Sequence, residues 1–563
     1  MPPPRTAPAH PPQAGRDLLV LGLLGLLLYG TGLGNHPLSN PDEARYAEIP
    51  REMLATADFV TPRLDGVKYF EKPPLVYWLV AGSLRVFGPG ETAARAVPAV
   101  VAILGVLLLY GAARRMHGRE AAWWSALVLA TSLLYFAHAR ILLLDMVVSV
   151  LISAVLVCFI LAVREPPGRT RRALFYGLYA AAALATLAKG LIGFLLPGAV
   201  MFFWLLGFNQ WRRLRPMHLP TGALLFLAIA APWHLLVATR NPEWAWFYFV
   251  HEHWLRFTTT THGRYQPWWF FLPVVILGFF PWTGFLWRAV RRGAAGGWGE
   301  RTRRADDWFP LVWAGFILLF FSASDSKLVP YILPVFPPLA WLVGRVLADL
   351  RARNESGPWK GPIGGSAVLA GLLGIAMIYL LLRPATINAP EKIIQLRPLV
   401  WPVALALPAA AAGGWWMLRR NRPGWALAGL LATTGLLYYT LDLAAPIIAR
   451  SSTKDLAAIV QREADPDDLV FCYHEFFHDF TYYARRTVGL VGGESELELF
   501  LDAGARASGN FITDADFEKL WTGPRTIFLI ARPEELPKLR AKPGFRVRVL
   551  GEEPGHLLLT NHF

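Results

Sequence analysis

Long apolar runs separated by short polar turns fill the first 444 residues of the chain. Most of these runs approach the ~20 residues that a helix needs to cross a bilayer. We expect spans near residues 17–34, 93–113, 121–137, 146–163, 173–189, 191–208, 218–238, 268–287, 308–322, 328–348, 363–382, 399–418 and 424–444. The pattern predicts a mainly α, polytopic membrane protein with about 13 transmembrane helices.

The pattern changes after residue 444. Short β-type runs at 469–473, 526–531, 545–550 and 556–560 alternate with helical patterns at 454–462, 494–501 and 534–539. Such alternation is typical of a small α/β domain, and this segment has no Gly-rich nucleotide-binding motif. We therefore divide the chain into a membrane domain, 1–444, and a C-terminal α/β domain, 445–563.

The Arg-rich turns between the apolar runs predict the orientation. They lie at 114–119, 164–172, 212–215, 288–304, 345–360 and 419–422. Cytoplasmic loops carry an excess of Lys and Arg. Thirteen spans with the N-terminus inside place all these turns in the cytoplasm, and the loop 35–92 and the domain 445–563 outside. The run 74–88 is short for a span, and its crossing would invert every turn, so we expect it at the outer interface.

Composition and charge exclude several classes of protein. The 563 residues are 54% apolar and only 17% charged, which excludes an ordinary soluble enzyme. Two cysteines exclude a disulfide scaffold. The net charge is +15, but residues 445–563 hold 14 Lys and Arg against 18 Asp and Glu, so the excess lies in the membrane domain's turns. That distribution sets topology, and we expect no nucleic-acid partner.

The first outer loop holds the densest group of chemically useful side chains. Asp42, Arg45 and Tyr46 are spaced i, i+3, i+4 at the start of a predicted helix, so they share one face. The helix dipole favours a charged Asp42, which could act as a general base or stabilise a developing cation. The alternative is a capping acid in a solvated ion pair.

A second group follows in the same loop, in the run Tyr69-Phe-Glu-Lys-Pro-Pro74. The prolines favour an extended segment that presents Glu71 and Lys72 from a fixed backbone. A lysine beside a membrane can bind phosphate as a point charge. The alternative is a surface charge pair that anchors an interfacial helix.

Further polar residues stand at the outer ends of the predicted spans. Asp145 faces apolar surroundings and needs a partner, for which Arg140 or an arginine of another loop is a candidate. Lys189 adds a cation, and Lys327 and Tyr331 are four apart and can share a face. Individually these could be snorkelling or anchoring residues. Collected on one side of a bilayer, they suit a polyanionic lipid substrate.

Two histidines flank an acid in His251-Glu-His253. On a helix these three side chains do not share a face, so their spacing is not that of a local zinc motif. One of the histidines could still join a distant carboxylate at a metal.

Several motifs resemble those of lipid-linked-sugar transferases with the C-type membrane glycosyltransferase fold. They are P-D-E-A-R-Y at 41–46, E-K-P-P at 71–74, the acid at 145, E-H-W-L-R-F at 252–257 and K-L-V-P-Y-I-L-P at 327–334. The chain is most similar to the family of 4-amino-4-deoxy-L-arabinose transferases that modify lipid A, which is related to protein mannosyltransferases. The resemblance covers almost the whole chain in order.

The resemblance implies a bacterial inner-membrane enzyme, surrounded by membrane lipids, with its site and C-terminal domain facing the periplasm. It would move a sugar, expected to be aminoarabinose, from undecaprenyl phosphate to lipid A. One alternative is a related transferase that modifies a protein or another glycan. The others are a membrane transporter and a sensor or scaffold whose C-terminal domain binds a partner.

By position, the resemblance also implies roles for individual residues. Asp42 would be the key catalytic acid, with Asp145 supporting it. The residues that would contact the sugar donor or line its cavity are Arg45, Tyr46, Tyr69, Lys72, Lys189, Arg256, Lys327 and Tyr331. Glu71 and His253 would bind a divalent metal, expected to be zinc, with His251 as a competing ligand.

Overall fold

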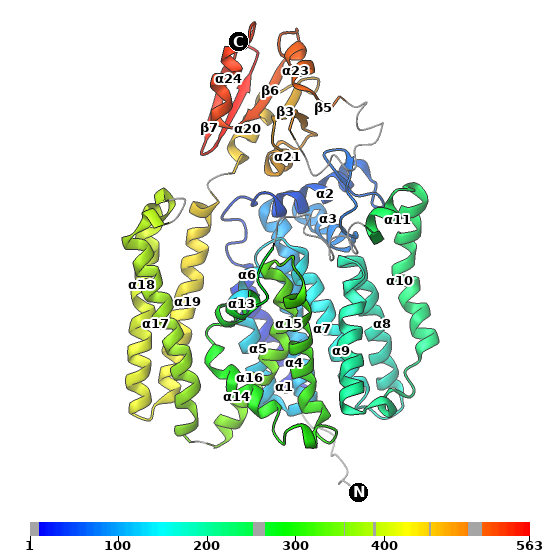
Figure 1. The fold of residues 1–563 in the computed structure, drawn as a ribbon, viewed down its shortest axis with the longest axis vertical. Helices are drawn as coiled ribbons and strands as arrows, with labels where there is room; N and C mark the ends of the chain where they lie inside the picture. The colour runs from blue at the N-terminus through cyan, green and yellow to red at the C-terminus, as the bar shows by residue number, and fades with distance from the viewer. Residues whose placement is uncertain (1–10, 251–264, 354, 387–389, 450–451, 494–508) are drawn as a thin grey trace.

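The computed structural model describes residues 11–250, 265–353, 355–386, 390–449, 452–493 and 509–563. The molecule has two layers along its long axis. A large bundle of roughly parallel helices forms one, and a smaller α/β domain sits on one end of it (Figure 1). The first outer loop, residues 35–92, lies between the two (Figure 1).

The bundle contains the helices predicted from the apolar runs. They are α1 (Pro11–Gly25), α4 (Glu91–His117), α5 (Arg119–Ala130), α6 (Leu133–His138), α7 (Leu144–Ala162), α8 (Arg169–Lys189), α9 (Ile192–Phe208), α10 (Leu219–Arg240), α13 (Phe271–Gly278), α14 (Leu286–Gly293), α15 (Ala305–Ala323), α16 (Phe336–Arg353), α17 (Lys360–Leu382), α18 (Pro390–Arg419) and α19 (Pro423–Ile448). A central group that includes α4, α5, α7, α15 and α16 is flanked by α8–α10 on one side and α17–α19 on the other (Figure 1).

Each of the thirteen predicted spans coincides with a helix or with consecutive short helices. Within the described ranges, nine helices are long and apolar enough to cross a membrane, or ten if α13 and α14 form one span bent by 111°. The structure thus confirms a polytopic helical protein without establishing the count of thirteen. The difference lies in α8, whose first turn contains Arg169, Arg171 and Arg172, and in short or interrupted elements. The 121–137 run divides at Ser132 into α5 and α6, and α9 has 17 residues.

The first outer loop is folded rather than extended. It contains α2 (Asp42–Thr56), the strand pair β1 (Arg63–Leu64) and β2 (Val67–Lys68), and α3 (Leu75–Phe87). Helix α2 starts with two acids in its first turn and ends at Ala57, whose φ of 56° is left-handed. Helices α2 and α3 lie at the end of the bundle, under the α/β domain (Figure 1). The 13-residue α3 covers the short 74–88 run, and its place at the outer interface stays a prediction.

The C-terminal domain contains one six-stranded mixed sheet in the order β5-β4-β3-β6-β8-β7. Its strands are β3 (Leu469–Tyr473), β4 (Gly489–Val491), β5 (Phe511–Ile512), β6 (Ile527–Ala531), β7 (Arg548–Glu553) and β8 (His556–Thr560). Strands β3 to β6 pair in parallel, and β8 pairs antiparallel with β6 and β7. Its helices are α20 (Lys454–Glu463), α21 (His478–Ala484), α23 (Asp514–Trp521) and α24 (Leu536–Ala541).

The predicted α/β domain is confirmed, with corrections of detail. Strands β4 and β5 were not predicted because both are very short, and the 545–550 strand begins later, at Arg548. Helix α19 continues to Ile448, four residues past the predicted boundary. The predicted helix at 494–501 lies outside the described residues.

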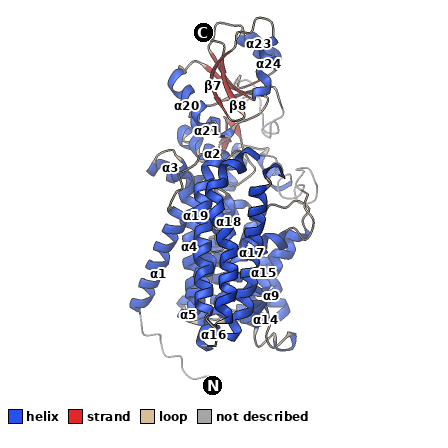
Figure 2. Ribbon diagram, turned by 90° about the vertical axis from the view of Figure 1, so that its left-hand side faces the viewer, coloured by secondary structure: helices blue, strands red, loops and turns tan. Residues whose placement is uncertain are grey.

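The α/β domain is tied to the first loop through α21, which packs on α2 (Figure 2). The Leu38 N–H donates to the Tyr483 hydroxyl at 2.8 Å, and the Asp479 N–H donates to the Asn40 side chain at 3.1 Å. The Tyr483 hydroxyl donates in turn to Glu91 at the start of α4, at 3.0 Å. The first loop is therefore held from both sides, by the bundle below and by the domain above.

Candidate functional site

Helix α2 presents the Asp42 carboxylate and the Arg45 guanidinium on one face, as the i, i+3 spacing predicts. Arg45 Nη2 donates to Asp42 Oδ1 at 2.5 Å. The Arg45 side chain is 6% exposed and the Asp42 side chain is 51% exposed. The guanidinium also lies 5.5 Å from the Tyr46 ring centre and 5.8 Å from that of Tyr69. A buried, ring-stacked cation thus holds an accessible carboxylate in place.

Three acids from three separate segments lie close enough to Tyr46 for their charges to act on its hydroxyl. Burial raises the pKa of the Tyr46 hydroxyl well above its ordinary value, while the Arg45 charge lowers it. The nearby carboxylates of Asp42, Glu71 and Asp145 each raise that pKa further. The hydroxyl therefore stays protonated and remains a hydrogen-bond donor. The structure thus brings together side chains that are more than a hundred residues apart in the sequence.

Glu71 and Lys72 lie at the edge of this cluster. Lys72 Nζ donates to the Glu71 main-chain carbonyl at 2.9 Å and lies 3.8 Å from Glu71 Oε2, which is beyond hydrogen-bonding distance. The two side chains are 20% and 12% exposed respectively. Tyr77 of the adjoining α3 packs 6.3 Å from Tyr46, ring centre to ring centre. The short segment between β2 and α3 thus presents a carboxylate and an ammonium beside the α2 face.

Asp145 pairs with a lysine rather than with an arginine. Lys189 Nζ donates to Asp145 Oδ1 at 2.5 Å and lies 4.8 Å from the centre of the Tyr331 ring. Asp145 is in the first turn of α7 and Lys189 in the last turn of α8, where the helix dipoles favour these charges. The expected partner Arg140 instead binds Asp442 of α19. The arginine pairing was wrong because α7 and α8 pack directly against each other.

Lys327 is buried and already engaged. Its side chain donates to the Gln266 carbonyl at 2.7 Å and to the Ser324 carbonyl. It holds the turn after α15 against the segment at Tyr265, where Tyr265 and Ser326 form an isolated antiparallel bridge. An ammonium has three N–H donors, so one remains for a substrate oxygen.

The remaining predicted residues cannot be placed. Arg256, His251 and His253 belong to the segment 251–264, which is outside the described residues. Their roles in donor and metal binding stay predictions.

The sequence did not reveal one prominent polar interaction of the first loop. Arg95 of α4 is fully buried and uses all five of its N–H donors. Two go to the Glu43 carboxylate at 2.8 Å each, and three go, also at 2.8 Å, to the carbonyls of Leu33, His36 and Pro37. The only available clue was a charge placed three residues into an apolar run, because such a charge requires a partner.

This buried pair positions the catalytic candidate. Glu43 accepts further hydrogen bonds from the Ser39 hydroxyl at 2.7 Å and from the Leu142 N–H at 2.9 Å. It therefore joins the first loop, α4 and the segment before α7. Asp42 is the adjacent residue, so its backbone is fixed by the same bonds.

A second group of acids lies on another side of α2, toward the α/β domain. Glu48, Glu52 and Asp65 are all buried, with carboxylate oxygens within 4.8 Å of one another. Arg51 binds both oxygens of Glu48, at 2.5 and 2.7 Å. Burial, together with the Glu48 charge, raises the pKa of Glu52 to about 8, and burial raises that of Asp65 strongly. Glu52 and Asp65 therefore hold protons near neutral pH, which disfavours a cation between them.

Two family models match the chain. That of dolichyl-phosphate-mannose-protein mannosyltransferases matches residues 71–236, and that of the aminoarabinose transferase C-terminal domain matches residues 456–561. Among solved structures, the crystal structure of ArnT from Cupriavidus metallidurans bound to undecaprenyl phosphate is similar with a TM-score of 0.85 and 30% identity. That similarity covers 97% of this chain and 98% of the other.

Two curated relatives carry the same name, undecaprenyl phosphate-alpha-4-amino-4-deoxy-L-arabinose arabinosyl transferase. The one from Pseudomonas aeruginosa (strain UCBPP-PA14) is 34% identical over 436 residues, 76% of each chain. The one from Aeromonas salmonicida (strain A449) is 34% identical over 367 residues, and the match spans 64% of the relative's length and 64% of this chain.

The helical membrane domain, with its cluster of acids and cations on a folded first loop, has the fold of membrane glycosyltransferases that use lipid-linked sugars. Within that class, the chain belongs to the family of undecaprenyl phosphate-aminoarabinose arabinosyl transferases. The resemblance seen in the sequence motifs is confirmed at the level of the family and the fold.

Proposed function

We propose that this protein transfers 4-amino-4-deoxy-L-arabinose from undecaprenyl phosphate to a phosphate of lipid A. The observation that carries the proposal is the Asp42–Arg45 pair against the Tyr46 and Tyr69 rings, together with the Asp145–Lys189 pair between the ends of α7 and α8. The family to which the chain belongs and the undecaprenyl phosphate named with its structural relative support the same donor.

The donor's phosphate is the leaving group. The bond from the sugar's anomeric carbon to the phosphate oxygen breaks, and the electron pair stays on that oxygen. Cations placed where this charge develops stabilise the transition state. Lys189 and Lys72 can serve, because each is partly exposed at the edge of the cluster. Lys327 can donate its third N–H to the same departing phosphate.

The acceptor's phosphate forms the new bond to the anomeric carbon from the opposite side, so the configuration inverts. A phosphate monoester, with a second pKa of about 6, is already largely ionised near neutral pH and brings no proton to remove. The Asp42 carboxylate then stabilises positive charge on the sugar ring. A hydroxyl acceptor would instead require Asp42 to take a proton.

We also propose a divalent metal, zinc, at Glu71 and His253. Glu71 fits this role, because its carboxylate is partly exposed beside the cluster and can supply one oxygen ligand. A bound metal would neutralise charge on the donor phosphate. Elemental analysis should show metal in the wild type and loss of it in Glu71→Ala. Glu243→Ala, an exposed acid paired with Lys68, is the control. Equal metal in wild type and Glu71→Ala excludes Glu71.

The protein's orientation in a bacterial inner membrane is part of the same proposal. The Arg-rich turns favour a cytoplasmic location for the bundle end opposite the α/β domain. Reporter fusions after Glu91 and after Ser452 should both indicate the periplasm, and a fusion after Arg420 the cytoplasm. A cytoplasmic result at Ser452 would contradict the orientation.

The acceptor is tested directly with purified protein and a radiolabelled lipid-linked donor. Transfer should occur to phosphorylated lipid A with no protein present, and should vanish when that lipid A is enzymatically dephosphorylated. Labelling of a peptide, with none of phosphorylated lipid A, would instead indicate a protein acceptor.

A further inference from the structure

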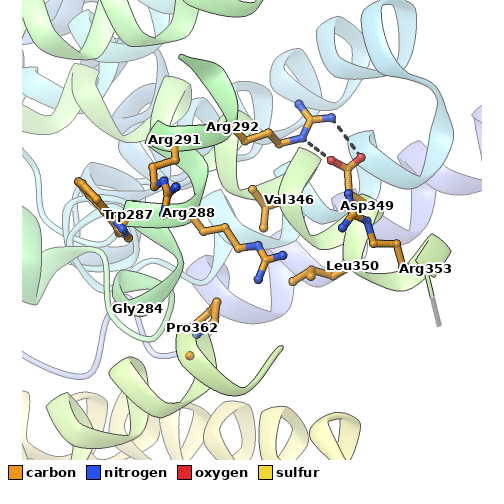
Figure 3. Close-up of a pocket in the computed structure, with 11 residues that line it drawn as sticks. Gly284, Trp287, Arg288, Arg291, Arg292, Val346, Asp349, Leu350, Arg353 and Pro362 are labelled. Atoms are coloured by element: carbon orange, nitrogen blue, oxygen red, sulfur yellow. Dashed lines mark hydrogen bonds and ion pairs between the residues drawn. The ribbon is translucent and has the colours of Figure 1, made fainter. Parts of the chain in front are cut away.

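A cavity lies at the end of the bundle opposite the α/β domain and far from the Asp42 cluster (Figure 1). It occupies about 750 Å³ between α14, α16 and the start of α17. Its lining includes four arginines, at 288, 291, 292 and 353, and one acid, Asp349. Three positive charges are therefore not neutralised within the cavity (Figure 3).

Local packing explains why the cavity exists. Gly284, in the 3₁₀ turn η4 (Thr283–Phe285), approaches α17 so closely that a Cβ there would lie 2.1 Å from the Pro362 carbonyl oxygen. The Gly284 N–H also donates to the Ser366 hydroxyl at 3.1 Å. This backbone contact fixes the floor of the cavity. Arg288, one turn further along, is then directed across it toward Leu350 (Figure 3).

The four arginines differ in how strongly they are held. Arg292 is paired with Asp349, with one contact at 3.1 Å, and Arg288 Nη1 donates to the Pro358 carbonyl at 2.6 Å. Arg291 lies 6.0 Å from the Trp287 ring centre. Neither Arg291 nor Arg353 has an acidic partner within the described part of the chain. These two guanidiniums keep donors available for an anion.

One of the lining residues is a large, exposed aromatic side chain. Trp287 is 71% exposed, and Val290, three residues further along the same helix, is 39% exposed. A tryptophan beside arginines at the end of a membrane bundle is characteristic of the headgroup level of a bilayer. Basic pockets between transmembrane helices bind anionic lipid headgroups, and arginine suits phosphate because its planar fork can donate two parallel hydrogen bonds.

We propose that this cavity binds the phosphate headgroup of an anionic phospholipid from the adjoining leaflet, with Arg291 and Arg353 as its principal contacts and Trp287 against the glycerol and acyl region. The site is separate from the sugar-transfer site and does not depend on the proposed function. A headgroup bound there would hold α14, and with it the broken α13–α14 span, in place against α16 and α17.

The test measures phospholipid retained by the full-length purified protein, by native mass spectrometry after titration with phosphatidylglycerol or cardiolipin. Arg291→Gln with Arg353→Gln should weaken retention about 25-fold, since each arginine near a membrane surface contributes roughly a fivefold factor. The matched control is Arg419→Gln with Arg420→Gln. It removes the same charge at the same end of the bundle, where each arginine stacks on a tryptophan outside the cavity.

A second pair, Arg291→Lys with Arg353→Lys, keeps the charge but removes the planar fork, and should retain lipid at an intermediate level. Equal losses in the two glutamine variants would overturn the proposal, because surface charge alone would explain binding. Inorganic phosphate that displaces phosphatidylglycerol at equal concentration would also overturn it, because the site would then recognise a free anion.

Discussion

Two neighbouring acids at the start of α2 are used in opposite ways. Asp42 keeps half of its side chain exposed, and within the described residues that side chain has one hydrogen bond, to Arg45. Glu43, the next residue, is 3% exposed, and its two oxygens accept bonds from Arg95, Ser39 and Leu142. One helical position turns a side chain by about 100°, which is enough to move a carboxylate from the outer surface to the interior.

The difference shows what separates a reactive acid from a structural one. A carboxylate that acts on a substrate needs an accessible oxygen, whereas a buried carboxylate needs every oxygen satisfied. The two are nevertheless linked, since the bonds to Glu43 hold the backbone on which Asp42 stands. A catalytic side chain is only as well placed as the residues that support it.

The largest expected effect follows from replacing the exposed acid. Asp42→Asn should lower the rate of sugar transfer by about 10²–10⁴-fold, because it removes a charge that acts in the transition state. Thermal unfolding should change little, since the asparagine keeps an oxygen that can accept the Arg45 bond and the replaced side chain is half exposed to solvent. Turnover with labelled donor and a melting curve in detergent measure both.

The control for that variant is Asp455→Asn, an exposed acid of α20 on the same side of the molecule. It should leave transfer unchanged. Wild-type turnover in well-folded Asp42→Asn protein would exclude Asp42 from the mechanism. Asp42 would then be no more a reactive acid than Glu43 is.

Replacing the buried acid Glu43 should have the opposite effect, with a large loss of stability and a smaller effect on transfer. Glu43→Gln or Arg95→Met should destabilise the protein by about 3–5 kcal/mol, because each leaves a buried charge without its partner. Thermal unfolding and the yield of folded protein measure this loss. Transfer by the folded fraction should fall much less than in Asp42→Asn, because Glu43 holds the backbone on which Asp42 stands but does not itself act on the substrate. A variant that remains stable but loses transfer as completely as Asp42→Asn would show that Glu43 acts in the chemistry.

The double variant Glu43→Gln with Arg95→Met sharpens the same point. It removes both charges, so it should recover part of the stability lost in each single variant. Additive losses would mean that the two side chains act independently, despite their two bonds at 2.8 Å.

The sequence predicted the Asp42 cluster far better than the buried Glu43–Arg95 pair. Asp42, Arg45 and Tyr46 lie within five residues, so local helical periodicity was enough to place them on one face. The Asp145–Lys189 pair joins different helices, and only their packing selects the lysine over Arg140. Glu43 and Arg95 are 52 residues apart, and neither has a local pattern that marks it. Long-range partners of this kind follow from the tertiary fold alone.

A third prediction follows from the buried carboxyls of Glu52 and Asp65. They are buried like Glu43, but they are not each paired with a cation as Glu43 is paired with Arg95. Burial raises the pKa of Glu52 from 4.5 to about 8, so the folded protein binds a proton that the unfolded chain releases above 4.5. This contribution to stability is fully present below 4.5 and is lost as the pH rises through about 8, by about 1.4 kcal/mol per pH unit for each proton.

Melting temperatures recorded from pH 5 to pH 9 measure this loss. Glu52→Gln should flatten the profile, since an amide keeps the neutral form at every pH. Glu243→Gln, an exposed acid, should leave the slope of the wild type unchanged. A wild-type profile that is flat across this range would contradict the raised pKa of Glu52.

The smallest effect is expected at the exposed counterpart of the Glu43–Arg95 pair. Lys454 of α20 binds Glu91 of α4 at 2.5 Å and joins the α/β domain to the bundle, but its side chain is 45% exposed. Solvent and salt screen such a pair, so Lys454→Met should cost less than about 1 kcal/mol, and less still at high salt. Glu91 also keeps its bond from Tyr483. Melting curves at low and high salt measure the change, with Lys519→Met, which removes an exposed pair within the α/β domain, as the control. A loss as large as that of Arg95→Met would show that the position of a charge pair between domains, rather than its burial, decides its contribution.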